Sequence, residues 1–150
     1  MMKKSLVLFT VIAAALLLTG CLSPKINFRI EPNPIVVTFD DFALRNVTLH
    51  FRLSGIGSYT LKSVLVEGMD DQGELVFSHQ EDMNETIFVV PGVSDSVDLP
   101  TVDLSDLCDE MGIELSETAY NSELKGKTFQ LKITLTGKNP TSDTAELKFE

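Results

Sequence analysis

From residue 26 onward, apolar and polar residues alternate one by one along much of the chain. The pattern is clearest in the segment FQLKITL at residues 129–135, and it recurs at residues 26–30, 35–39 and 47–53. Successive side chains of a β-strand point to opposite faces of a sheet, so a period of two predicts strands with one buried and one solvated face. The pattern therefore predicts a mainly β protein.

Turn signals separate the alternating segments. The run DDQG at residues 70–73 predicts a hairpin turn between a strand at 59–69 and a strand ELVFSH at 74–79. We expect ETIFVV at 85–90 to form a further, separate strand. The prolines of EPNP at 31–34 cannot donate hydrogen bonds to a central ladder, which is typical of an edge strand that changes sheets.

Residues 93–125 break the period of two. Four apolar residues there recur at the i, i+3, i+4, i+7 spacing that lines one face of a helix, namely Leu104, Leu107, Cys108 and Met111. Asp103 or Ser105 can cap the start of this helix, and Gly112 can end it. A second turn or helix is expected at about 116–124.

Together these elements predict an antiparallel β-sandwich of seven to eight strands, with a short helical insertion at about 103–124 before the penultimate strand. Residues 26–150 then form a single domain. The arrangement resembles immunoglobulin-like and fibronectin-like modules. Because the chain has no tryptophan, it lacks the Cys…Trp…Cys pattern of antibody domains. The resemblance concerns the architecture and implies no site residues.

Residues 1–20 have the features of a signal peptide. Lys3 and Lys4 precede an apolar run at 6–18. A helix of these 13 residues spans roughly 20 Å, whereas a bilayer core of about 30 Å needs roughly 20 residues. The run is therefore short for a transmembrane helix and suits a cleaved leader.

The end of this leader, Leu18-Thr19-Gly20-Cys21, resembles the lipobox of bacterial lipoproteins. The resemblance implies that the Cys21 thiol receives a diacylglyceryl group and that the chain is cut just before this residue. An acyl chain such as palmitate is often added to its new amino group. Residues 21–25 would form the lipidated cysteine and a short tether. Leu22, in place of Asp, implies the outer membrane under the enteric-type sorting rule of the family. The alternatives are an ordinary secretory leader and a retained transmembrane anchor.

The charge of the expected mature chain limits its partners. From Cys21 to Glu150 the chain has 130 residues, with ten basic against 22 acidic residues and a formal charge of −12. Such a chain is not expected to bind nucleic acid, which requires a basic patch. The only other cysteine is Cys108, so no internal disulfide is available.

The acidic residues are unevenly placed. Residues 63–124 carry 16 acids and no lysine or arginine, whereas the rest of the mature chain carries ten basic and six acidic residues. This segment can be a solvated surface, can orient the domain away from an anionic membrane, or can bind calcium. The candidate calcium ligands are Asp95, Asp98, Asp103, Asp106, Asp109 and Glu110. They do not form a DxDxDG loop.

No catalytic motif stands out. The sequence has no nucleophile elbow and no phosphate-binding loop. His50 and His79 lack a partner at metal-ligand spacing, and Cys108 lies on the apolar helix face beside acidic residues that disfavour a thiolate. We therefore expect a protein that is not an enzyme and has no cofactor, calcium apart.

The sequence favours a lipoprotein of the cell envelope, held on the extracytoplasmic side of a membrane through Cys21. It would act as a structural module or bind an envelope protein that the sequence does not identify. The alternative is a lipoprotein that binds calcium or a small ligand through residues 95–110.

Overall fold

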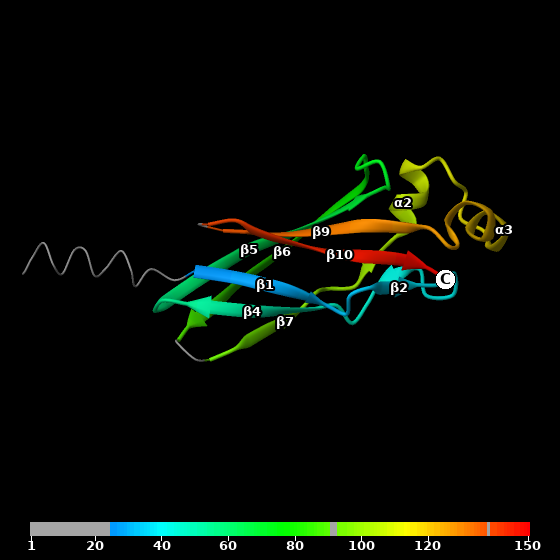
Figure 1. Ribbon diagram of the computed structural model, residues 1–150. Coiled ribbons are helices and arrows are strands. Elements are labelled where there is room, and N and C mark those ends of the chain that lie inside the picture. The colour runs from blue at the N-terminus through cyan, green and yellow to red at the C-terminus, as the bar shows by residue number, and fades with distance from the viewer. Residues whose placement is uncertain (1–24, 91–92, 138) are drawn as a thin grey trace, which may run out of the picture.

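The computed structural model describes residues 25–90, 93–137 and 139–150. The predicted signal peptide, the lipobox with Cys21 and most of the tether lie outside these residues. The described chain forms two main β-sheets packed face to face (Figure 1). None of its described helices is both long enough and apolar enough to span a membrane.

The two sheets differ in size. The smaller sheet has the order β1 (Lys25–Glu31), β4 (Thr48–Ser54) and β7 (Asp95–Asp98). The larger has the order β2 (Ile35–Val37), β10 (Thr141–Phe149), β9 (Thr128–Thr136), β5 (Gly57–Met69) and β6 (Leu75–Val89). A short pair joins β3 (Ala43–Leu44) to β8 (Val102–Asp103). The predicted mainly β sandwich is confirmed, with ten strands where seven to eight were expected.

The prolines at 31–34 separate strands of different sheets, as predicted. Before them, β1 pairs antiparallel with β4 at the edge of the smaller sheet; after them, β2 lies at the edge of the larger sheet. There β2 runs parallel to β10, with Ile35 opposite Leu147. This is the one parallel pairing among the described strands, and it departs from the expected antiparallel arrangement.

The core lies between the two sheets. The alternating residues of β1 and β9 are buried as the period of two predicts, with burial on every second position. Side chains that are fully enclosed come from both sheets and from the helical insertion. The largest of them are Tyr120, Phe149, Leu44, Leu49, Leu61, Leu104, Leu107, Leu124, Leu131, Ile133, Leu135 and Leu147. Burial of this apolar surface is the main favourable contribution to folding.

The predicted hairpin at residues 70–73 is confirmed, but its second strand is longer than expected. The two segments 74–79 and 85–90 belong to one strand, β6, rather than to two. The register against β5 shifts between Leu61 and Ser63, and Asn84 has φ of +51°. This β-bulge takes up the extra residue and keeps the polar middle of β6 in the sheet.

The helical insertion is confirmed in place and extent. It contains α2 (Ser105–Glu110), α3 (Glu117–Ala119) and a π-helical turn η1 (Tyr120–Leu124), all before β9. Asp103 Oδ1 accepts a hydrogen bond from the Ser105 amide at 2.8 Å, and Gly112 follows α2 with φ of +68°. The Ser116 hydroxyl caps α3 through the Ala119 amide.

One boundary and three short strands differ from the expectation. Lys25 was assigned to the tether, but it is the first residue of β1 and pairs with Ser54. The short strands β3, β7 and β8 were not predicted. Residues 26–30 are thus part of the smaller sheet, which leaves residues 22–24 between this strand and Cys21.

Candidate functional site

The sandwich has two ends, at which different elements meet (Figure 1). At the entry end, β1 begins, β4 turns into β5 at residues 55–56, and β6 ends. At the helical end lie the β5–β6 turn at residues 70–74, α2 and α3. The 13 residues of β5 run from one end to the other, a length of about 40 Å at roughly 3.3 Å per residue.

Acidic residues gather at the helical end. Residues 70–74 and 103–124 contribute ten carboxylates and no lysine or arginine. They are Asp70, Asp71, Glu74, Asp103, Asp106, Asp109, Glu110, Glu114, Glu117 and Glu123. Lys125 and Lys127 follow directly in the chain. This end therefore presents a predominantly negative surface to any partner.

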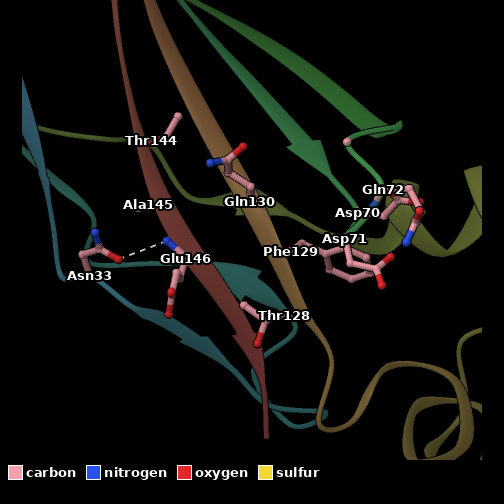
Figure 2. Close-up of a pocket in the computed structure, with 11 residues that line it drawn as sticks. Asn33, Asp70, Asp71, Gln72, Thr128, Phe129, Gln130, Thr144, Ala145 and Glu146 are labelled. Atoms are coloured by element: carbon pink, nitrogen blue, oxygen red, sulfur yellow. Dashed lines mark hydrogen bonds between the residues drawn. The ribbon is translucent and has the colours of Figure 1, made fainter.

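A depression of about 560 Å³ opens beside the β5–β6 turn (Figure 2). Four separate segments line it: the turn itself, the start of β9, the middle of β10 and the residues between β1 and β2. Asn33 Oδ1 accepts a hydrogen bond from the Glu146 amide at 3.0 Å and so ties two of these segments together. The other polar lining residues are Asp70, Asp71, Gln72, Thr128, Gln130 and Thr144.

The turn that borders the depression is held by its own aspartate. Asp70 Oδ1 accepts hydrogen bonds from the amides of Gln72 and Glu74, both at 2.9 Å. These contacts fix the turn, as aspartate does in Asx-turns. The fixed turn places Asp71 and Gln72 in the lining of the depression.

The chemistry of the depression is that of recognition through hydrogen bonds. Its lining offers carboxylates, amides and threonine hydroxyls, but no histidine, cysteine, lysine or arginine. A second depression shares Asp70, Asp71, Thr128 and Phe129 with the first and adds Lys127 and the apolar Val76 and Met111. Together the two linings carry three acidic residues, Asp70, Asp71 and Glu146, and one lysine.

The structure does not bring the six predicted calcium ligands together. Asp95 and Asp98 lie on β7, whereas Asp106, Asp109 and Glu110 lie on α2. Asp98 accepts a hydrogen bond from the Thr48 hydroxyl at 2.8 Å. Among the residues that the structure describes, no three or more His, Cys, Asp or Glu side chains are grouped as a metal site would require.

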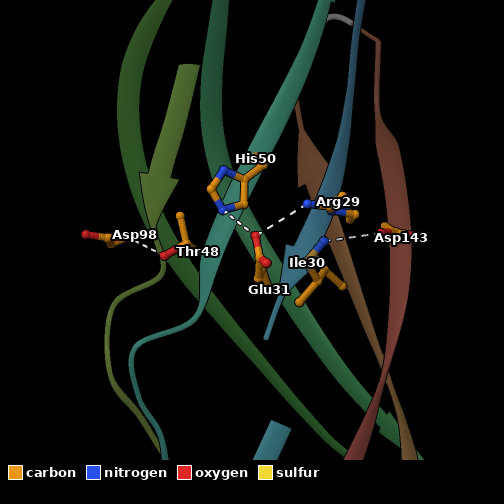
Figure 3. Close-up of polar contacts among 7 residues, drawn as sticks. All are labelled: Arg29, Ile30, Glu31, Thr48, His50, Asp98 and Asp143. Atoms are coloured by element: carbon orange, nitrogen blue, oxygen red, sulfur yellow. Dashed lines mark hydrogen bonds and ion pairs between the residues drawn. The ribbon is translucent and has the colours of Figure 1, made fainter. Parts of the chain in front are cut away.

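Both histidines lie close to surface carboxylates. His50 Nε2 lies 2.8 Å from a carboxylate oxygen of Glu31, which Arg29 also approaches at 3.4 Å (Figure 3). His79 lies 3.6 Å from Glu81. All of these side chains are at least one-third exposed, and exposed pairs contribute little to stability.

Cys108 is enclosed in the core, with 1% of its surface exposed. Burial raises the pKa of its thiol, and the neighbouring Asp109 charge raises it further. Both effects disfavour the thiolate that a reactive cysteine needs. The side chain packs as a small apolar group, as predicted from its place on the helix face.

The sequence matches no protein-family model and no curated protein. Among solved structures, the chain is similar to a β-glucuronidase of glycoside hydrolase family 2, with a TM-score of 0.40 and 9% identity over 83% of this chain and 11% of that one. It is also similar to the ligand-binding region of serine-glutamate repeat protein A (SgrA) of Enterococcus faecium, with a TM-score of 0.35 and 11% identity over 84% of this chain and 97% of that region. Likenesses this distant carry no argument about function.

Sequence reasoning identified the turn at residues 70–73 but not the depression beside it. Some of the lining residues are more than 100 residues apart in the chain, such as Asn33, between β1 and β2, and Glu146 of β10. No local pattern reports this contact. The excess of acids at 63–124 was the only signal that pointed to this end of the molecule.

Proposed function

We propose that this protein is a lipid-anchored module of the cell envelope that is not an enzyme and binds a partner at its helical end. The observation that carries the proposal is the placement of the two ends. The described chain begins at the entry end, close in sequence to Cys21, and the acidic residues with the depression lie at the opposite end.

The sheet order supports an immunoglobulin-like form of the sandwich. The order β10-β9-β5-β6 corresponds to the G-F-C-C′ order of variable-type domains, and β1-β4-β7 to the A-B-E order. Modules of this architecture serve many functions, so the form of the sandwich supports an interaction role without naming a partner.

The short tether sets the position of the domain. Three residues, 22–24, lie between Cys21 and Lys25, and the four residue steps reach at most about 14 Å at full extension. A lipidated Cys21 would hold the entry end against the membrane, while the helical end would stand about 40 Å away along β5. Repulsion between its carboxylates and an anionic lipid surface favours the same orientation.

Lipidation is tested by feeding cells a labelled fatty acid and isolating the protein. The wild type should incorporate label and sediment with membranes, and Cys21→Ala should do neither. Cys108→Ala is the matched control, because it removes the other cysteine and should leave incorporation unchanged. Equal incorporation in the wild type and Cys21→Ala would exclude lipidation at this residue.

The interaction role is tested with crosslinked envelopes that carry tagged full-length protein. A specific protein partner captured by the wild type, and lost with Asp71→Asn and Gln72→Ala at the mouth of the depression, supports the proposal. Ser142→Ala on the same face of the molecule is the control, since it lies outside the depression.

A polar small ligand is the second candidate, because the depression has the volume and the hydrogen-bonding groups for one. In that case capture would yield no partner, and added ligand or calcium would raise the melting temperature. Unchanged melting at millimolar calcium would exclude the calcium alternative.

A further inference from the structure

Four exposed apolar side chains gather at the entry end of the sandwich. They are Ile56, Phe88, Val90 and Val93, and each is between 49% and 71% exposed. Phe88 is the most exposed large apolar side chain of the described residues. We call these four residues the entry rim.

The strand register brings the rim together. Gly57 pairs with Val89 and Ser58 with Phe88, so Ile56 and Val90 lie one residue beyond the last pair of the β5–β6 ladder. Val93 follows within three residues and donates its amide to the Val90 carbonyl at 3.2 Å. Exposed apolar groups concentrated in one place mark contact sites rather than ordinary surface.

The start of the described chain lies beside this rim. Lys25 opens β1 and pairs with Ser54, two residues before Ile56. The expected lipid attachment at Cys21 is four residues upstream of Lys25. Cys21 therefore lies within about 14 Å of Lys25, whose partner Ser54 is two residues before Ile56 of the rim.

The charges around the rim suit an anionic lipid surface. Lys25 and Arg52 are exposed within three residues of this end, and Asp95 is the one acid of the described residues there. The helical end, about 40 Å away, carries the concentrated carboxylates. Lysine and arginine next to a membrane are attracted by anionic headgroups, whereas carboxylates are repelled.

We infer that the entry rim is a second membrane contact, in which Ile56, Phe88, Val90 and Val93 insert into the headgroup and acyl-chain boundary beside the lipidated Cys21. This inference rests on the proposed lipid anchor. The two acyl chains of the expected diacylglyceryl group already give stable attachment, so apolar side chains inserted beside them would chiefly fix the tilt of the domain.

The inference is tested with the lipidated full chain in vesicles of phosphatidylethanolamine and phosphatidylglycerol. An environment-sensitive fluorophore is attached at Phe88→Cys or, as the control, at Leu75→Cys. Leu75 lies at the helical end and is 58% exposed, close to the exposure of Ile56 at 57%. Cys108 is buried and does not compete for the label.

Emission from position 88 should shift to the blue and be quenched by lipids that carry a quencher on the acyl chain. Emission from position 75 should change in neither respect. Ile56→Asp should reduce the quenching at position 88, while Leu75→Asp should leave it unchanged. A probe at position 88 that is not quenched in the anchored protein would overturn the inference.

Labelled fatty acid measured in the same sample separates the two proposals. If Cys21 is lipidated but the probe at position 88 is not quenched, the lipid anchor is supported and the membrane contact of the entry rim is wrong. If Cys21 carries no lipid, the proposal of an anchor is wrong, and its free thiol would also take the label. The entry rim is then tested by adding vesicles to the free chain labelled at position 88 in the Cys21→Ala background. Quenching at position 88 would support it, and no quenching would overturn it.

Discussion

The hydroxyl of Tyr120 lies 2.8 Å from the main-chain carbonyl oxygen of Glu150, and it lies 2.9 Å from that of Val37. Through this one side chain, the helical insertion is bonded to the ends of β10 and β2. The ring is 2% exposed and contacts the rings of Phe42 and Phe149 at centroid distances of 6.0 and 6.3 Å. Tyr120 therefore holds the insertion against the sandwich.

Tyr120→Phe should destabilise the fold by about 0.5–1.5 kcal/mol, because it removes the hydrogen bonding of the hydroxyl to the two main-chain carbonyls while the ring packing is kept. The Val37 carbonyl still accepts a hydrogen bond from the Glu150 amide at 3.0 Å, so the loss stays modest. Urea unfolding followed by circular dichroism measures this loss. Asn121→Ala, at an exposed neighbouring position, should have a much smaller effect. Equal midpoints for the wild type and Tyr120→Phe would contradict the assigned hydrogen bonds.

Stability should fall as the pH rises above about 10, the ordinary pKa of tyrosine. Burial raises the pKa of Tyr59, and it raises that of Tyr120 despite the hydrogen bond to Glu150. The unfolded chain therefore loses these protons at a lower pH than the folded chain, so the stabilisation is complete below pH 10 and is lost above it.

Absorbance at 295 nm and circular dichroism, recorded during one alkaline titration, test this expectation. The two tyrosines are the only ones in the chain, so the absorbance reports on them alone. Ionisation of both should coincide with unfolding. Ionisation near pH 10 with native circular dichroism would show that the side chains are open to water.

Gly68→Ala should destabilise the protein by about 1–3 kcal/mol through overpacking. A Cβ atom at Gly68 would lie 1.9 Å from the Phe77 ring, which is 3% exposed and has little room to move. Thermal unfolding measures the change, with Ser78→Ala at an exposed position as the control. In the double variant, Phe77→Leu should relieve part of the loss, and strictly additive losses would argue against the clash.

Cys108 should react with thiol reagents only after unfolding. Its side chain is buried and its thiol pKa is raised, so both access and thiolate content are low in the native state. The Cys21→Ala variant leaves Cys108 as the only cysteine for this assay. Reaction at the same rate with and without denaturant would contradict the buried position.

The sequence predicted the elements whose burial is decided locally. The alternation at residues 129–135 placed every apolar side chain of β9 correctly, and the helical spacing placed Leu107 and Cys108 in the core. In these segments the side-chain pattern and the burial have the same period. The pattern within each segment is therefore sufficient to predict which of its side chains are buried.

The elements that were missed depend on contacts far along the chain. Residues 80–84 were not included in a predicted strand and are mostly polar, yet they belong to β6, an edge strand that water can reach, so polar residues are tolerated there. β7 contains only Val97 as an apolar residue and becomes a strand by pairing with β4, as Leu49 opposite Val97 illustrates. The sequence of neither segment indicates which strand it pairs with.

If the protein is anchored as proposed, the open edge of β6 also affects how neighbouring copies meet on the membrane. Copies held by one end in a membrane share one orientation and diffuse in two dimensions, so identical edges meet more often than in free solution. Among the described residues no strand covers the outer edge of β6, and Glu81, Asp82 and Glu85 are exposed along it. Charge repulsion between these edges would keep neighbouring copies separate and leave each helical end accessible.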